Sequence, residues 1–168
     1  RKRLVDLLTA WQHVRDALPG AQLLLAGEAR DQTRTQLLDL LRPADRSSVQ
    51  FAGRLDDAGL VAAYSRAWVT VVPAVHEALG LVTLESLACG TPVAGADSGA
   101  TPELLGRPGT GTLFAPGDPA ALAAAVVRAV DLSQQPETRE VCRSAALDRA
   151  WPRIIEQVER ISAAVIGW

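Results

Sequence analysis

The stretch WVTVVPAVHEALGLVTLESLACGTPVAGA, residues 68–96, decides the fold of this chain. Residues 68–72 form a β-branched run that ends at Pro73, the sequence over 81–89 is typical of a helix, and 92–96 is again short and apolar. A strand, a helix and a second strand in this order form a crossover unit, which joins two parallel strands. This stretch therefore predicts a parallel sheet that is covered by helices.

The same alternation continues on both sides of this unit. Further short strands are predicted at 21–26, 49–52 and 111–114. Further helices are predicted at about 4–18, 31–41, 56–66, 101–105, 118–130, 136–148 and 151–166. Alternating strands and helices indicate an α/β domain with a doubly wound, Rossmann-like parallel sheet, and the chain is expected to form one domain over residues 1–168.

Composition excludes several other classes of protein. Hydrophobic residues make up 48% of the 168 residues, so the chain is expected to fold around a core of its own. The net charge of −2 argues against a general nucleic-acid-binding protein. No apolar run is long enough to span a membrane. Cys89 and Cys142 stand far apart with no further ligand at metal spacing, so we expect no disulfide, no metal site and a cytoplasmic location.

The polar residues after the 68–72 strand suggest a ligand site. In doubly wound sheets, ligands bind beyond the carboxyl ends of the strands. Here a loop carries Glu77, Gly80 begins a helix, and Glu85 follows one turn into that helix. The free N–H groups of a helix start attract a diphosphate, and an ionised carboxylate accepts hydrogen bonds from hydroxyls. A nucleotide sugar carries hydroxyls on both sides of a diphosphate, so it matches this layout.

These residues resemble a known family. Glu77 and Glu85 lie eight positions apart with Gly80-Leu81 between them, as in the retaining GT-B glycosyltransferases of the family-four type. Segments that match the same family follow at 88–93 (Ala-Cys-Gly-Thr-Pro-Val), 98–103 (Ser-Gly-Ala-Thr-Pro-Glu) and 111–114 (Gly-Thr-Leu-Phe). The resemblance runs from Lys2 to the helix at 151 and identifies the C-terminal, nucleotide-sugar donor-binding domain of such an enzyme.

The resemblance implies a role for each residue around the helix start. Glu77 would be the catalytic residue, holding hydroxyls of the transferred sugar near the reacting carbon. Glu85 would hold the ribose. The backbone N–H groups around Gly80, Leu81 and Val82 would bind the diphosphate.

The remaining donor contacts implied by the family lie elsewhere in the chain. Lys2 would neutralise the leaving diphosphate, and the backbone near Arg54 and Leu55 would face the base. Such enzymes retain the anomeric configuration and use a UDP- or GDP-linked sugar as substrate. They need no metal or other cofactor, because basic side chains and the helix start stabilise the leaving charge.

The sequence departs from the family pattern at two places. Ala78 and Leu79 stand where the family usually has glycine or proline and then phenylalanine, which changes the shape beside the sugar. The family's opening strand, which ends in Gly-Arg, has no counterpart here. We expect its place in the sheet, between the strands at 21–26 and 68–72, to be unfilled, so that these two strands do not pair.

The resemblance also concerns parts outside the chain. The isolated chain is expected to bind donor but to be inactive without an N-terminal GT-B domain, which would supply the acceptor contacts. The helix at about 150–168 would dock back toward that domain. Any peripheral association with a membrane would come through that domain alone.

Two other functions compete with this interpretation. A UDP-sugar epimerase has a related fold but lacks the two glutamates in this loop and helix. A non-catalytic, nucleotide-binding Rossmann-like module would bind a ligand without chemistry. For other residues we expect structural roles: Trp11, Trp68 and Trp151 as core or docking residues, and Cys89 as a buried, inert thiol.

Overall fold

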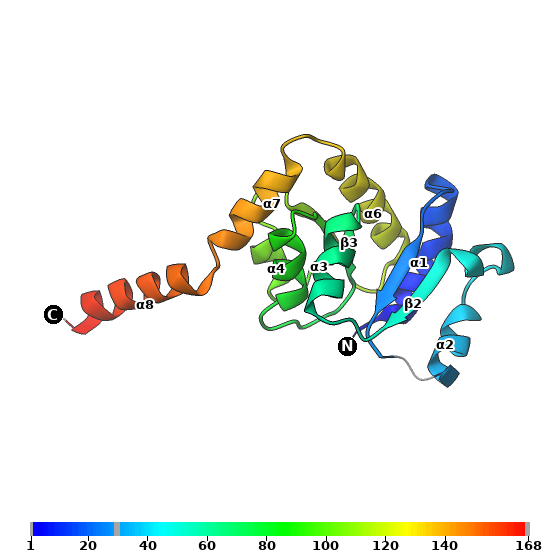
Figure 1. Cartoon of the computed structure of the whole chain (residues 1–168), viewed down its shortest axis with the longest axis horizontal. Helices are drawn as coiled ribbons and strands as arrows, with labels where there is room; N and C mark the ends of the chain where they lie inside the picture. Colours follow the sequence, from blue (N-terminus) through cyan, green and yellow to red (C-terminus); the bar gives the residue numbers. More distant parts are fainter. Residues whose placement is uncertain (1, 29–30, 167–168) are drawn as a thin grey trace.

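The computed structural model describes residues 2–28 and 31–166. All five predicted strands are present: β1 (Leu23–Ala26), β2 (Val49–Gly53), β3 (Thr70–Val72), β4 (Val93–Ala96) and β5 (Gly111–Phe114). The helices are α1 (Leu4–Ala17), α2 (Asp31–Leu38), the 3₁₀ helix η1 (Pro43–Ser48), α3 (Asp57–Arg66), α4 (Leu81–Ala88), α5 (Thr101–Leu104), α6 (Pro119–Ser133), α7 (Thr138–Leu147) and α8 (Trp151–Ile166). Strands and helices alternate along the chain as predicted (Figure 1).

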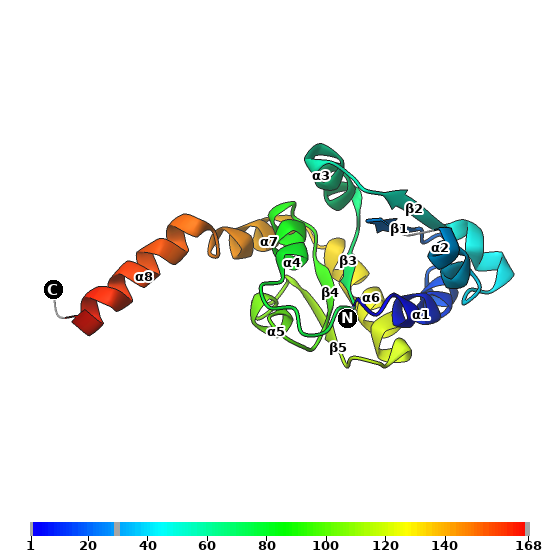
Figure 2. The same cartoon turned by 90° about the horizontal axis from the view of Figure 1, so that it is seen from below.

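The strands form two separate parallel sheets. β1 pairs with β2, and the second sheet has the order β3-β4-β5. Within the described residues β1 and β3 are not hydrogen-bonded to each other, as predicted. Figure 2 shows the two sheets as distinct groups of strands. Leu24 of β1 is 47% exposed, although parallel strands are normally covered on both faces.

Helices cover both faces of the three-stranded sheet, which confirms the doubly wound α/β architecture. All four residues of β4 are buried, and neighbouring residues face different cores. Ala94 packs with α1 and α6 in a cluster that also contains Leu23 of β1, so α1 and α6 join the two sheets through one core. Val93 packs in a second cluster with Leu87 of α4 and Cys142 of α7.

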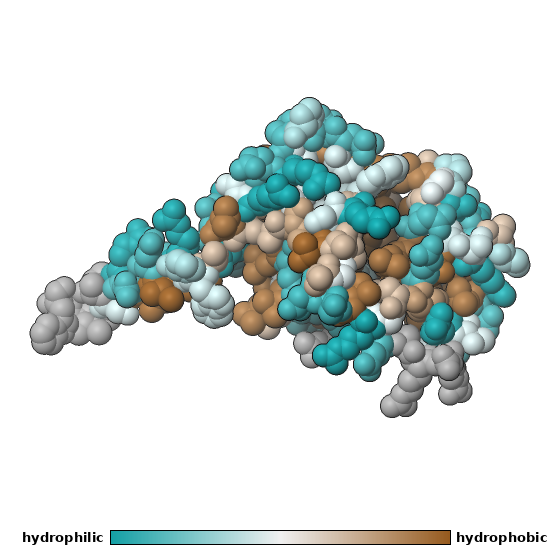
Figure 3. All heavy atoms as spheres, viewed as in Figure 1, coloured by the Kyte–Doolittle hydropathy of each residue, from teal (hydrophilic) through white to brown (hydrophobic). Residues whose placement is uncertain are grey.

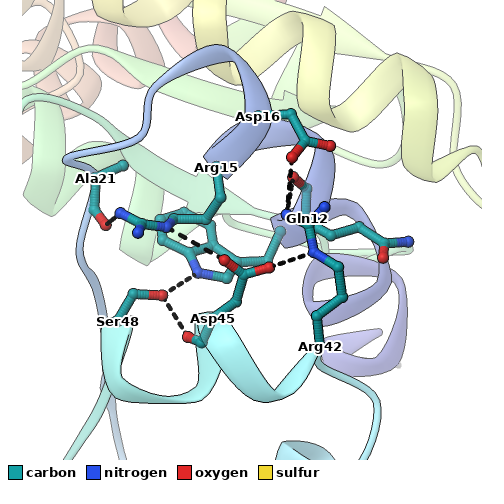
Figure 4. A network of polar contacts seen from close by, with 8 residues as sticks. Gln12, Arg15, Asp16, Ala21, Arg42, Asp45 and Ser48 are labelled. Carbon is teal, nitrogen blue, oxygen red and sulfur yellow. Dashed lines mark hydrogen bonds and ion pairs between the residues drawn. The ribbon is translucent and has the colours of Figure 1, made fainter.

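The helix η1, which the sequence analysis did not predict, is held by a polar network around Asp45 (Figure 4). Asp45 is 5% exposed, and its carboxylate accepts a hydrogen bond of 2.6 Å from Nε of Arg42 and lies 3.5 Å from Nε of Arg15. Beside it, the indole N–H of Trp11 donates to Oγ of Ser48 at 2.8 Å. A buried carboxylate is tolerated because it is paired and hydrogen-bonded in this way. Trp11 is therefore a core residue, as predicted.

Trp68 and Trp151 were expected to be core or docking residues. Trp68 is 60% and Trp151 is 76% exposed, so neither belongs to the core of the described structure, and a docking role for them stays a prediction. Trp68 precedes β3, which begins only at Thr70, and Trp151 begins α8, which extends away from the rest of the chain (Figure 1). Cys89 is partly exposed rather than buried, because it follows the last turn of α4.

The described part of α8 carries exposed apolar side chains. Besides Trp151, these are Ile155, Val158 and Ile161, and Figure 3 shows hydrophobic atoms on this helix beside hydrophilic ones. That this helix docks on an N-terminal domain stays a prediction.

Two buried threonines lead to a prediction about stability. The hydroxyls of Thr83 and Thr101 are fully buried and have no hydrogen-bond partner among the residues that the structure describes. Valine has nearly the same shape without the hydroxyl, so Thr83→Val and Thr101→Val are each expected to raise the free energy of unfolding by about 1 kcal/mol. Urea denaturation measures this change.

The matched control is Thr91→Val. The hydroxyl of Thr91 is also buried, but it donates a hydrogen bond of 2.6 Å to the carbonyl of Tyr64. Its loss is expected to lower the free energy of unfolding by about 1 kcal/mol. Destabilisation of the same size in all three variants would show that the first two hydroxyls are also partnered.

Candidate functional site

The start of α4 is uncapped and lies at the surface of the described structure. Gly80 precedes the helix with φ 64° and ψ 39°, and no side chain in the described structure caps this end. The first two helical residues, Leu81 and Val82, are 58% and 38% exposed. Helix N–H groups that have no acceptor within the helix therefore lie at an accessible surface, and the helix dipole favours negative charge there.

Glycine is required at position 80 for two reasons. Its positive φ is unfavourable for residues with a side chain. A Cβ at this position would also lie 2.4 Å from Cδ1 of Leu104 in α5. The backbone before α4 thus packs against the core while its N–H groups stay open.

The loop that carries Glu77 is held by the residues after β4. The backbone N–H of His76 donates to Oγ of Ser98 at 3.2 Å, and the N–H of Ala100 donates to the carbonyl of Glu77 at 2.9 Å. A Cβ on Gly99 would lie 2.5 Å from that same carbonyl oxygen. His76 itself has φ 58°, a conformation that non-glycine residues rarely adopt. The segment 98–100 therefore fixes the backbone from which the Glu77 side chain extends.

Lys2 and Glu77 form an ion pair in the described structure. Nζ of Lys2 is 3.9 Å from Oε1 of Glu77. The Lys2 side chain is 71% exposed and that of Glu77 is 20% exposed. Such an exposed ion pair contributes little to stability, but it places a cation beside the carboxylate near the start of α4.

Glu85 interacts with a different helix. Its Oε2 accepts a hydrogen bond of 2.9 Å from the hydroxyl of Tyr64, which lies in the last turn of α3. Burial raises the pKa of the Tyr64 phenol above its usual range, and the bond to Glu85 raises it further. The phenol therefore keeps its proton at neutral pH and acts as the donor to the carboxylate.

The two residues expected near the base lie apart from these contacts. Arg54 and Leu55 directly follow β2, where Gly53 has φ 67°. They stand at the carboxyl end of their strand, as predicted. No hydrogen bond or ion pair of the described residues joins them to α4 or to Glu77, so their part in the site stays a prediction.

Two features of the site were missed by sequence reasoning. The contact between Tyr64 and Glu85 joins residues 21 positions apart on different helices, which no local pattern reveals. The segment 98–100 was noted as a family match, but its contacts with the Glu77 loop were not foreseen. Gly99 could have revealed these contacts, because a glycine between a buried strand and a short helix indicates that another backbone segment approaches closely there.

Neither a metal cluster nor a membrane-spanning helix is found in the described residues. They contain no group of three His, Cys, Asp or Glu side chains that could hold a metal ion. None of the described helices has the length and apolar character needed to cross a membrane.

Together these elements have the parts needed to bind a polar ligand with a central negative charge. N–H groups of a helix start are flanked by Glu77, which is part-buried and fixed by its backbone, and by Glu85, which is held by Tyr64. Both carboxylates can accept hydrogen bonds from hydroxyls, and Lys2 adds an exposed positive charge.

Comparison with known proteins shows which family this chain belongs to. The model of the family "Glycosyl transferases group 1" matches residues 1–131. The chain is 37% identical over 131 residues to a glycogen synthase of Mycobacterium tuberculosis, covering 77% of this chain and 31% of that protein. It is 32% identical over 168 residues to a phosphatidyl-myo-inositol mannosyltransferase of Mycobacterium leprae, covering 98% of this chain and 44% of that protein.

A solved structure with similar sequence extends this comparison. The sucrose-phosphate synthase of Thermosynechococcus elongatus superposes with a TM-score of 0.74 and 30% identity, over 99% of this chain and 43% of that one. The chain thus spans less than half the length of each of these proteins.

Proposed function

Because this chain belongs to the group 1 glycosyl transferase family, we propose that it is the donor-binding domain of a retaining glycosyltransferase. Such an enzyme moves a sugar from a nucleotide diphosphate sugar to an acceptor. The observation that carries the proposal is the uncapped start of α4, with Gly80 in a left-handed conformation between Glu77 and Glu85. The family comparison does not favour an epimerase or a non-catalytic module.

Each residue then has a task in donor binding. The N–H groups of Gly80, Leu81 and Val82 bind the diphosphate. Glu85 accepts hydrogen bonds from the ribose, and Glu77 accepts them from the transferred sugar. Lys2 turns from Glu77 to the diphosphate when donor binds, because its exposed side chain is free to move.

The same arrangement supports a front-side transfer. The bond between the anomeric carbon and the phosphate oxygen breaks, and the acceptor oxygen bonds to that carbon on the same face. The acceptor proton passes to the leaving phosphate. Positive charge develops on the sugar in the transition state, where the negative charge of Glu77 is favourable, and Lys2 and the helix start stabilise the leaving diphosphate without a metal ion.

The proposal includes an N-terminal GT-B domain that supplies the acceptor site, with transfer in the cleft between the two domains. It also includes a further parallel strand between β1 and β3, whose facing edges are unpaired in the described structure. A strand there would satisfy backbone groups that otherwise lose hydrogen bonds at about 1–3 kcal/mol for each buried group.

The test uses this chain joined to an N-terminal GT-B domain. We expect transfer from a UDP- or GDP-linked sugar with retention of the anomeric configuration, seen by NMR of the product. EDTA is expected to leave the rate unchanged. A product of inverted configuration would contradict the retaining mechanism, and loss of activity in EDTA would contradict the metal-free one.

A further inference from the structure

Glu85 does not stand alone on α4, because its carboxylate is bonded to a neighbouring helix. The hydroxyl of Tyr64 donates to Oε2 of Glu85 at 2.9 Å, while Glu85 itself is exposed. An exposed glutamate normally samples several rotamers, and ordering it costs free energy when a ligand binds. A fixed donor on one oxygen removes part of that freedom.

The backbone of Tyr64 is in turn held by a hydrogen bond from the segment after α4. Its backbone carbonyl accepts a hydrogen bond of 2.6 Å from the buried hydroxyl of Thr91. The carbonyl of Thr91 lies 3.0 Å from Oγ of Ser86, the residue next to Glu85 in α4. The end of α3 and the middle of α4 are therefore joined through Thr91 as well as through the phenol. The contact between Tyr64 and Glu85 belongs to a fixed polar cluster and is not a chance meeting of two surface side chains.

Because the phenol is protonated, Tyr64 is the donor and Glu85 is the acceptor in this hydrogen bond. A tyrosine phenol carries its proton at neutral pH because its ordinary pKa is about 10, and burial and the neighbouring carboxylate raise the pKa of Tyr64 further. It can then only donate to Glu85. The second oxygen of Glu85, Oε1, has no hydrogen-bond partner among the described residues and is left to accept from a ligand hydroxyl.

We infer that Tyr64 is a positioning residue for nucleotide recognition, which orients Glu85 so that Oε1 meets the ribose hydroxyls of the donor. This inference rests on the proposed function, in which Glu85 binds the ribose. Tyr64 itself does not touch the donor. Its effect on binding must therefore pass through Glu85 and must depend on the ribose hydroxyls.

Calorimetry with four forms of the chain tests this inference: the unsubstituted chain, Tyr64→Phe, Glu85→Ala and the double variant. The ligands are UDP, GDP and their 2′,3′-dideoxy forms. Tyr64→Phe is expected to raise the Kd of the nucleotide that binds by about five-fold, the effect of one hydrogen bond. It is expected to leave the Kd of the dideoxy form within two-fold. In the Glu85→Ala background it is expected to have no further effect.

A matched control separates positioning from stability. The hydroxyl of Thr112 donates to the carbonyl of Ala125 at 2.8 Å, between β5 and α6. Thr112→Val is expected to lower the melting temperature as Tyr64→Phe does, without changing either Kd. Two results would contradict the role of Tyr64 without contradicting the proposed function. One is that Tyr64→Phe weakens the dideoxy form as much as the normal nucleotide. The other is that Tyr64→Phe still weakens binding by the same factor in the Glu85→Ala background. Failure of the unsubstituted chain to bind either nucleotide would overturn the proposed function and this inference with it.

Discussion

Replacing Gly99 with alanine is expected to destabilise the chain by about 3 kcal/mol and to weaken nucleotide-sugar binding more than ten-fold. A Cβ at this position would lie 2.5 Å from the carbonyl oxygen and 2.8 Å from the nitrogen of Glu77. Gly99 also has φ 60°, which costs a residue with a side chain about 1 kcal/mol, and overpacking costs about 1–3 kcal/mol more. Because the clash is with backbone, no rotamer change relieves it, and the Glu77 loop must move.

Urea denaturation and calorimetry measure the two effects of Gly99→Ala. Gly20→Ala is the matched control, because a Cβ on Gly20 has no atom within 4 Å and its φ is not positive. This control is expected to leave stability and binding unchanged. If Gly99→Ala were as stable as the control and bound the nucleotide sugar equally well, the segment 98–100 would not hold the Glu77 loop.

Replacing the two glutamates is expected to separate their roles. Glu85→Ala is expected to weaken the binding of the free nucleotide and of the nucleotide sugar alike, by about 20-fold. Both ligands carry the ribose, so both lose hydrogen bonds to a charged acceptor. Glu77→Ala is expected to weaken the binding of the nucleotide sugar only, since the free nucleotide lacks the transferred sugar that Glu77 contacts. Calorimetry with UDP, GDP and the matching nucleotide sugars measures both.

The two variants are also expected to differ in their steady-state kinetics. In an active two-domain enzyme, Glu85→Ala is expected to raise the donor KM, whereas Glu77→Ala mainly lowers kcat by about 100-fold. The reason is that the ribose is bound alike in the ground and transition states, while charge develops only at the sugar. Equal changes of KM and kcat in both variants would contradict the assignment of the two roles.

Most of the fold could be predicted because its signals are local. The helices predicted to begin at Asp56 and Asp118 do begin there, because each of these residues caps its helix by accepting a hydrogen bond from the backbone N–H three residues on. The strands followed from short apolar runs. The sequence could not decide between a core and a docking role for Trp68, because an aromatic residue at the start of a strand has the same local pattern whether it is buried or, as here, 60% exposed.

What could not be predicted depends on contacts between distant residues. The helix η1 forms around Asp45, whose partner Arg15 lies 30 positions earlier in α1. In the site, the spacing of Glu77, Gly80 and Glu85 reveals a helix start between two carboxylates, which the structure has. It does not reveal which of them has a partner, because Tyr64 reaches Glu85 only once α3 has packed against α4.

Calorimetry of the unsubstituted chain with UDP, GDP and NADH tests whether this chain binds a nucleotide diphosphate at the start of α4. We expect that UDP or GDP binds with a Kd of about 1 mM or tighter, that Glu85→Ala weakens this binding, and that NADH does not compete. Absence of binding by both UDP and GDP, or a preference for NADH, would contradict it.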